Sequence, residues 1–282
     1  MPQDTLKIPE LSLVLLIGST GAGKSTFARR LFKPTEIVSS DVCRGLVADD
    51  ENEQSASKDA FELLHYLVAK RLKRGLLTVV DATNVQAEGR KPLVALARQY
   101  HVLPVAIVLD VPEGEAHRRN ALRPERRHLG PHVVARHRQD LRRSLRTLKP
   151  EGFRHIHHLR GVAEIEAVQS ITRERLYNNR TEETGPFDII GDVHGCYDEL
   201  LALLGTLGYR VAAEPVADDR DLGVRVLPPA GRRAVFLGDL VDRGPASPQV
   251  LRLVMSMVRD GAALCVPGNH DIKLLRHPTA KK

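Results

Sequence analysis

The residues with the clearest chemical meaning form a glycine-rich run, Gly18-Ser-Thr-Gly-Ala-Gly-Lys-Ser-Thr26. Its spacing fits the pattern G-x-x-x-x-G-K-[ST], in which small residues let successive backbone N–H groups point at a phosphate. In this pattern the lysine, Lys24, reaches the β- and γ-phosphates of a nucleotide, and the hydroxyl of Ser25 binds Mg²⁺. We therefore predict a triphosphate site at Gly18, Gly21, Gly23, Lys24, Ser25 and Thr26.

The residues on either side predict the strand and the helix that such a loop requires. Residues 11–17 are almost continuously apolar, which is typical of a buried parallel strand. Residues 26–32 can open a helix that Pro34 ends, and the positive end of its dipole adds to the attraction for phosphate. The order of strand, glycine turn and helix indicates nucleotide binding rather than an ordinary glycine-rich turn.

Charged side chains follow two further predicted strands. Residues 37–39 predict a short strand, so Asp41 and Arg44 lie just beyond its carboxyl end, where open α/β sheets bind ligands. Asp41 is a candidate general base for an attacking hydroxyl, with helix N-capping as an equal alternative, and Arg44 is a candidate for holding a phosphate of the acceptor. In the run 76–84, Asp81 is the carboxylate that ends a predicted buried strand, and it is placed to hold Mg²⁺, with N-capping as the less favoured alternative.

The elements that position these residues alternate along the chain. Residues 56–74 and 86–100 predict helices, and residues 103–111 and 153–159 predict strands. Residues 163–176 predict a closing helix. Strands that alternate with helices indicate a doubly wound parallel sheet, so the predicted fold class is α/β.

Residues 113–148 are dense in arginine and predict two helices around a break at Pro124. Arg123 and Arg126 flank this break and are candidates for closing over the transferring phosphate, although the adjacent Arg127 is an equal candidate for the second position. One site seats only two or three guanidinium groups, so most arginines of this segment are expected on a solvated face that suits a polyanion. The segment contains Arg118, Arg119, Arg123, Arg126, Arg127, Arg136, Arg138, Arg142, Arg143 and Arg146.

These motifs, taken in order over roughly residues 10–150, resemble the polynucleotide 5′-kinase family, and most closely the kinase module of bacterial polynucleotide kinase-phosphatases. The resemblance implies a P-loop kinase that transfers the γ-phosphate of ATP, with Mg²⁺, to a 5′-hydroxyl of RNA or DNA. It assigns the general base to Asp41 and the contact with the acceptor phosphate to Arg44. A small-metabolite kinase and a non-catalytic ATP-binding RNA module are the alternatives that the motifs leave open.

A polar stretch ending in Gly185-Pro186 predicts a linker, so we expect a kinase domain over residues 1–178, a linker over 179–186 and a second domain over 187–282. Three motifs follow apolar strands in the second domain: D-x-H at 192–194, G-D-x-x-D-R-G at 238–244 and G-N-H-D at 268–271. In this order they resemble the binuclear metallophosphoesterase superfamily.

The resemblance implies a pair of divalent metal ions and the residues that hold them. Two adjacent ions need a bridging carboxylate, which Asp239 would supply. Asp192 and His194 would hold the first ion, and the carbonyl of Asn269 the second. Oxygen and imidazole ligands together favour Mn²⁺, iron or Zn²⁺ over Ca²⁺.

Two further residues have roles on the phosphatase substrate by the same resemblance. His270 would donate to the phosphate or the leaving group, and Arg243 would clamp the phosphate. In the polynucleotide kinase-phosphatases this module clears 2′,3′-cyclic or 3′-phosphates during RNA repair.

The superfamily places more histidine ligands well downstream of its G-N-H-[DE] motif, whereas the printed sequence ends at Lys282. We therefore expect the N-terminal part of such a domain, with an incomplete metal site and an exposed apolar sheet face that recruits a partner or a second copy.

Composition narrows the class of partner and the compartment. The formal net charge is +7 and the isoelectric point is about 9.5, which favours acidic partners such as nucleic acid. The three cysteines are far apart, so neither a disulfide framework nor a zinc knuckle is indicated. Residues 1–4 carry no basic segment of a signal peptide, and no apolar run approaches membrane-spanning length. We expect a cytoplasmic enzyme that acts on nucleic acid with 5′-hydroxyl ends, with RNA favoured and with no membrane partner.

Overall fold

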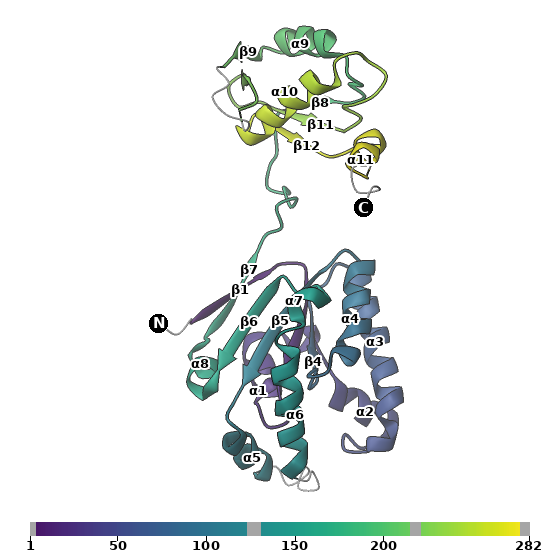
Figure 1. Ribbon diagram of the computed structural model, residues 1–282, viewed down its shortest axis with the longest axis vertical. Coiled ribbons are helices and arrows are strands. Elements are labelled where there is room, and N and C mark those ends of the chain that lie inside the picture. Colours follow the sequence, from purple (N-terminus) through teal and green to yellow (C-terminus); the bar gives the residue numbers. More distant parts are fainter. Residues whose placement is uncertain (1–3, 123–130, 215–220, 277–282) are drawn as a thin grey trace. The chain divides into compact units, whose positions relative to one another are not determined.

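The computed structural model describes residues 4–122, 131–214 and 221–276. Residues 1–179 and 180–282 form two compact units. Figure 1 shows both units as α/β layers, which confirms the predicted fold class.

A parallel 5-stranded sheet with the strand order β3-β4-β2-β5-β6 forms the centre of the first unit. Its middle strand, β2 (Ser12–Ile17), is buried along its whole length because apolar layers cover both sheet faces. On one side lie β4 (Thr78–Asp81) and β3 (Ile37–Ser39), and on the other lie β5 (Leu103–Asp110) and β6 (His155–Arg160).

Helices cover the two faces of this sheet and build two separate cores. Alternate residues of β2 enter each core, with Leu13 and Leu15 in one and Val14 and Leu16 in the other. The first core receives side chains from α3 (Ser57–Lys73), α4 (Ala87–Gln99), α6 (Pro131–Ser144) and α7 (Leu148–Glu151). The second receives side chains from α1 (Lys24–Leu31), α5 (Glu113–Ala121) and α8 (Gly161–Ala167). The remaining helical segments are η1 (Pro34–Glu36), α2 (Ser40–Ala48) and η2 (Gln54–Ala56).

The predicted closing helix over residues 163–176 is confirmed only for residues 163–167 and is wrong beyond them. α8 ends at Ala167, and the chain then forms β7 (Ser170–Glu174), which pairs in parallel with β1 (Thr5–Pro9), a strand that the sequence analysis did not predict. Leu6 and Ile8 of β1 are fully buried in the second core. Residues 170–174 form backbone hydrogen bonds with β1, and alternate residues of β1 are buried. These interactions override the helical sequence pattern of residues 170–174.

The second unit contains a 3-stranded parallel sheet of order β12-β11-β8. Its strands are β8 (Phe187–Ile190), β11 (Arg233–Phe236) and β12 (Ala263–Cys265). Helices α9 (Tyr197–Thr206) and α10 (Ser247–Arg259) contribute to the core against this sheet. A hairpin of β9 (Arg210–Ala213) and β10 (Val224–Leu227) and the helix α11 (Asn269–Arg276) complete the unit.

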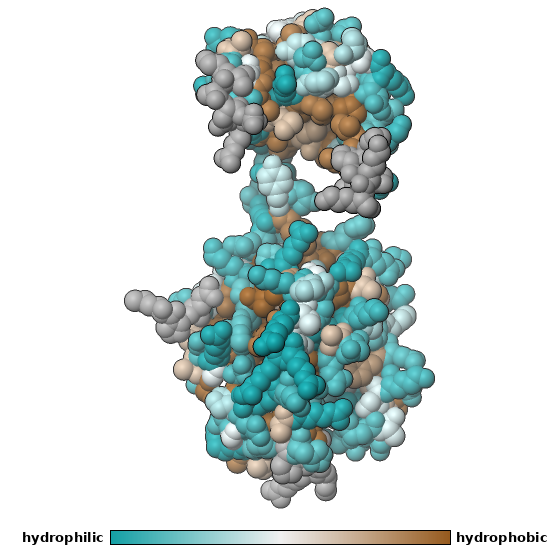
Figure 2. All heavy atoms as spheres, in the orientation of Figure 1, coloured by the Kyte–Doolittle hydropathy of each residue, from teal (hydrophilic) through white to brown (hydrophobic). Residues whose placement is uncertain are grey.

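Apolar side chains also lie on the surface of the second unit. Ile189 is 67% exposed, and Leu237 and Val266 are each 53% exposed. Figure 2 shows apolar surface over this part of the chain, near β12 and α11. Among the helices of the described segments, none is both long enough and apolar enough to cross a membrane.

Candidate active sites

The phosphate loop, residues 18–26, connects β2 to α1 in a conformation that requires glycine. Gly21 and Gly23 have φ angles of 82° and 90°, in the left-handed region that other residues rarely adopt. A Cβ atom at Gly21 would also collide with the backbone carbonyl oxygen of Ala116 in α5. The backbone therefore passes close to α5 and turns directly into α1, which begins at Lys24.

The ammonium group of Lys24 lies within this loop. Its Nζ donates hydrogen bonds of 2.9 Å to the carbonyl oxygens of Gly18 and Ser19, and the residue is only 8% exposed. Lys24 and Ser25 line a pocket beside the loop, which we call the central pocket. The predicted triphosphate residues Gly18, Gly21, Gly23, Lys24 and Ser25 thus lie in one loop, while Thr26 lines a neighbouring pocket.

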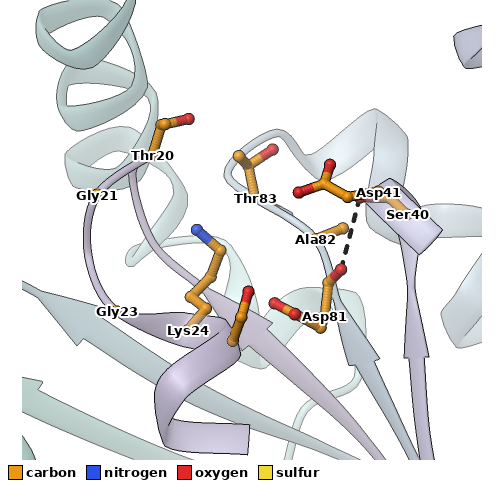
Figure 3. Close-up of a pocket in the computed structure, with 10 residues that line it drawn as sticks. Thr20, Gly21, Gly23, Lys24, Ser40, Asp41, Asp81, Ala82 and Thr83 are labelled. Atoms are coloured by element: carbon orange, nitrogen blue, oxygen red, sulfur yellow. Dashed lines mark hydrogen bonds between the residues drawn. The ribbon is translucent and has the colours of Figure 1, made fainter. Parts of the chain in front are cut away.

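Asp41 and Asp81 face the loop from the other side of this pocket. Figure 3 shows the side chains of Lys24, Asp41 and Asp81 pointing from three elements toward one space. Asp41 lies in the first turn of α2, and Asp81 is the last residue of β4. Neither carboxylate is a helix N-cap, because α2 is capped by Ser39 and α4 by Gln86. The capping alternative therefore does not explain either aspartate.

Arg44 is held beside Asp41 in a buried position. Its Nη1 donates to Asp41 Oδ1 at 3.0 Å and to the carbonyl oxygen of Glu51 at 2.6 Å. The residue is 7% exposed, and its Nε group is buried with no hydrogen-bond partner among the described residues. A buried guanidinium with an unmatched donor is costly unless an anion approaches it. The pair thus presents a proton acceptor next to a cation at the edge of the pocket.

Two larger cavities flank the phosphate loop. A cavity of about 370 Å³ shares Gly21 and Gly23 with the loop and is lined by α1, α5 and α8, including Arg119. A cavity of about 510 Å³ on the other side shares Thr83 with the central pocket. Its lining comes from α3, the start of α4 and the first two turns of α6. The three spaces therefore form a tract with the phosphate loop in the middle.

His137 of α6 contacts the phosphate loop, and its role was not apparent from the sequence because no local motif marks it. Its Nδ1 accepts from the backbone N–H of Thr20 at 3.5 Å and lies 3.4 Å from the Thr20 hydroxyl oxygen. Burial, and then the Lys24 ammonium, lowers the pKa of His137. The neutral ring can therefore accept these hydrogen bonds near pH 7, where an ordinary histidine is already mostly neutral.

Acid should weaken this contact. Since the folded-state pKa of His137 is lowered, its contribution to folding is complete above the unfolded value of about 6.5 and declines as the pH falls below it. We expect the melting temperature of the first unit to fall more between pH 7.5 and pH 5.5 in the unchanged protein than in His137→Asn, whose amide oxygen accepts at any pH. An NMR titration of the His137 ring with a midpoint at or above the ordinary histidine value would contradict this account.

The predicted lid arginines Arg123 and Arg126, with the alternative Arg127, lie outside the described residues. Their proposed role therefore remains a prediction. The neighbouring Arg119 is described, and it lines the cavity on the α1 side of the loop.

The second unit brings three potential metal ligands together. One potential ligand atom each from His194, Asp239 and His270 lies within 4.8 Å of the others. His194 and Asp239 were predicted as ligands, whereas His270 was assigned to the substrate. Imidazole and carboxylate groups at this spacing fit a first-row divalent ion. When bound, such ions polarise a phosphate ester and activate water.

The other predicted residues of this site lie around the three. Asp192 is exposed and is not one of the converging side chains, Asn269 is the first residue of α11, and Arg243 is exposed. His270 Nδ1 lies 2.8 Å from Asp242 Oδ2, and this hydrogen bond lowers the pKa of the Asp242 carboxyl.

Backbone strain gathers at the same loops. Five non-glycine residues of the motifs have left-handed φ angles, between 46° and 69°. Such conformations are costly and persist where the surrounding structure imposes them, often at functional sites. They are Asp192, His194, Asp239, Asp242 and Arg243.

Asp271 joins the two loops that carry the converging side chains. Its Oδ1 accepts from the backbone N–H of Leu240 at 3.0 Å, and its Oδ2 accepts from the backbone N–H of Gly268 at 2.9 Å. The residue is 9% exposed. Because Leu240 follows Asp239 and Gly268 precedes Asn269, this carboxylate positions the ligand loops relative to each other without being a ligand.

Asp271→Asn should therefore lower metal affinity. An amide can accept only one of the two backbone hydrogen bonds, and loss of such supporting contacts typically costs about 10- to 100-fold in affinity. Titration of the apo-protein with Mn²⁺ against a chelator dye measures this directly, without an activity assay. The exposed Asp198→Asn is the matched control, and equal Mn²⁺ affinity of both variants and the unchanged protein would refute the role of Asp271.

Each of the two units is similar to a known protein family. Residues 13–148 match the family described as AAA domain, and residues 185–281 match the calcineurin-like phosphoesterases. The chain is 48% identical over 96 residues to a bis(5′-nucleosyl)-tetraphosphatase PrpE of Halalkalibacterium halodurans, which covers 34% of this chain and 35% of that protein. For PrpE of Bacillus subtilis strain 168 the identity is 46% over 92 residues, covering 32% and 33%.

Among solved structures, the Pnkp1/Rnl/Hen1 RNA repair complex aligns with 93% of this chain and 81% of its own chain, at 16% identity and a TM-score of 0.45. The chain spans about a third of the length of the curated relatives it matches. It joins a P-loop domain of kinase type to a metallophosphoesterase domain, and both resemblances drawn from the sequence are confirmed at this level. Both domains are of enzyme families that use nucleotides or divalent metal ions.

Proposed function

We propose that the first unit is an ATP-dependent polynucleotide 5′-hydroxyl kinase. The observation that carries this proposal is the placement of Asp41 across the central pocket from Lys24, with Arg44 hydrogen-bonded to Asp41. A carboxylate that faces the triphosphate site can take the proton of an attacking hydroxyl, and the guanidinium beside it can hold a phosphate of the same acceptor. A domain that only bound nucleotide would need neither group there.

The tract of three spaces supports an in-line transfer. The base and ribose of ATP occupy the cavity beside Arg119, the phosphates occupy the loop, and the 5′-terminal nucleoside of the acceptor occupies the cavity of about 510 Å³. The attacking and leaving oxygens then lie on opposite sides of the γ-phosphorus, as the displacement requires.

In the reaction, Asp41 accepts the proton of the 5′-hydroxyl, and the oxygen of that hydroxyl forms a bond to the γ-phosphorus. The bond from that phosphorus to the β–γ bridging oxygen breaks, and ADP leaves. Lys24 stabilises the charge on the β- and γ-oxygens, and the lid arginines Arg123 and Arg126 are proposed to add to this. Ser25 and Asp81 both line the pocket and would hold Mg²⁺, which neutralises phosphate charge when bound with ATP.

The size and lining of the acceptor cavity favour a nucleotide over a small polar metabolite. It is lined by Phe61, Val85 and Val133 together with His65, whose buried Nε2 has no partner among the described residues. An apolar cavity with a few polar groups suits a base and a ribose.

An acceptor competition separates the two classes of kinase. Labelled ATP is offered with a 5′-hydroxyl RNA, a DNA of the same sequence, and a panel of small hydroxyl metabolites. We expect the label on an oligonucleotide, whereas transfer to a metabolite alone would establish the small-metabolite alternative. Oligonucleotide binding without transfer would indicate the non-catalytic module.

For the second unit we propose a phosphoesterase activity that depends on a divalent metal ion. His194, Asp239 and His270, with help from Asn269, would hold this ion. Its substrate by the resemblance stated above is a 2′,3′-cyclic or 3′-phosphate of RNA. The 48% identity to a bis(5′-nucleosyl)-tetraphosphatase favours a second candidate, an asymmetrically cleaved dinucleoside tetraphosphate. Assays of both substrates with Mn²⁺, using Asp239→Asn as the inactive reference, decide between them.

A further inference from the structure

We propose that the outer face of α6 binds the sugar–phosphate backbone of the acceptor strand beyond its 5′-terminal nucleotide. This inference rests on the proposed kinase function and names how a long acceptor is held. We call the surface the α6 track and define it by Arg136, Arg142, Arg143 and Arg146.

The arginines around α6 fall into two groups by their partners. Arg118 and Arg119 pair with Glu115, and Arg138 lies 4.0 Å from Asp110 and 3.8 Å from Glu113. The four arginines of the α6 track, by contrast, are exposed, and none has a carboxylate within 4.0 Å among the described parts of the chain. Cations that neutralise no carboxylate of the described residues are available to an external polyanion.

The spacing places the track on one face. Arg136 and Arg143 are seven residues apart, or about two helical turns, and Arg146 follows in the turn after α6. The rise from Arg136 to Arg146 is roughly 15 Å, which is long enough to meet several phosphates of a strand. Figure 2 shows strongly hydrophilic side chains gathered over α6 and toward α7.

The track begins at the acceptor cavity. Arg136 lines that cavity together with His132, Val133 and His137. A strand whose 5′-terminal nucleoside fills the cavity therefore leaves it beside Arg136, and its following phosphates meet Arg143 and Arg146. The surface and the cavity are parts of one path rather than separate features.

The chemistry of the face selects nucleic acid over a membrane. The apolar residues Val134 and Leu141 of α6 point into the two cores and are buried, so the outer face offers cations without an apolar stripe to insert into lipid. In the described part of the chain none of these four arginines makes a cation–π contact. Arginines of this kind bind backbone phosphates rather than bases, so binding should be independent of sequence and sensitive to salt.

The test compares a short and a long acceptor in the triple variant Arg142→Gln, Arg143→Gln, Arg146→Gln. We expect the KM for a 5′-hydroxyl 20-mer to rise about 10-fold or more, relative to any change in KM for a nucleoside 3′-phosphate. The slope of log affinity against log salt for the 20-mer should become shallower by about 2, since each lost phosphate contact on a single strand contributes about 0.7. Fluorescence anisotropy of a labelled 20-mer measures that slope without catalysis.

A charge-matched control removes three cations elsewhere in the same unit. Lys70→Gln, Lys73→Gln, Arg74→Gln changes the end of α3 and leaves the same net charge as the track variant. If both triple variants weaken 20-mer binding equally, the track is refuted and only net charge matters. If polyglutamate displaces the 20-mer as effectively as unlabelled RNA does, the surface binds polyanions of any kind and the inference is overturned.

The two levels of proposal fail in different ways. Without phosphate transfer to any acceptor the kinase assignment fails, yet the anisotropy difference between the triple variants still decides the track. Transfer to the 20-mer that is unaffected by the track variant keeps the kinase and removes the track.

Discussion

Replacing Asp41 by asparagine should lower the rate of phosphate transfer by about 10²- to 10⁴-fold, the range that positioned general bases contribute. The amide has nearly the shape of the carboxylate but cannot take the proton of the 5′-hydroxyl. Affinity for ATP should stay within about twofold, because the groups proposed to hold the triphosphate lie in the phosphate loop, whereas Asp41 lies in α2 and accepts a hydrogen bond from Arg44. Single-turnover transfer and calorimetric titration with ATP measure the two quantities.

Asp59→Asn is the matched control for this change. Asp59 lies in the first turn of α3, as Asp41 lies in the first turn of α2, and its side chain is exposed. Normal turnover of the Asp41 variant would show that another group takes the proton. A loss of ATP binding equal to the loss of rate would show that Asp41 serves the nucleotide instead.

Lys24→Met should impair both steps. The ammonium is the buried cation of the phosphate loop, and loss of a charged hydrogen bond of about 1.5–3 kcal/mol corresponds to a roughly 10- to 150-fold weaker affinity for ATP. The transfer rate should fall by a further 10²- to 10³-fold or so, because the same group stabilises charge on the moving phosphate. Methionine keeps the length and apolar contacts of the side chain, so the loop should retain its fold.

Lys33→Met is the control on the same segment, since Lys33 lies just after α1 and is exposed. ATP affinity and rate are measured as for Asp41. Unchanged ATP affinity in Lys24→Met would contradict the assignment of residues 18–26 as the triphosphate site, whatever happens to the rate.

The parts of this protein that could be predicted from the sequence are those where chemistry and local structure share one short segment. The phosphate loop is such a case, because its glycines, its lysine and the flanking strand and helix all lie within about two dozen residues. Asp41 and Asp81 were found by the same logic, since the carboxyl ends of neighbouring parallel strands meet at one sheet edge. The three motifs of the second unit could likewise be placed at strand ends.

Residues whose role depends on distant partners could not be predicted. His137 contacts the phosphate loop although 117 positions of sequence separate it from Thr20. The buried Arg90 pairs with Glu151 at 2.6 Å and donates a hydrogen bond to the carbonyl oxygen of Asn84, which lies three positions after Asp81. Asp271 was quoted as part of a motif, but its bridging of two loops is visible only in the fold. The incorrect part of the helix predicted over residues 163–176 also results from a distant partner. Residues 170–174 form a strand that pairs with β1, at the other end of the unit in sequence.

The central claim is that the pocket between Lys24 and Asp41 moves the γ-phosphate of ATP onto a 5′-hydroxyl. The most direct measurement is the location of label after incubation of γ-labelled ATP with two oligonucleotides that differ only at the 5′ end, one with a hydroxyl and one already phosphorylated. We predict label on the 5′ oxygen of the first, none on the second, and none on either with Asp41→Asn. Label released only as inorganic phosphate, or equal labelling of both oligonucleotides, would contradict the account.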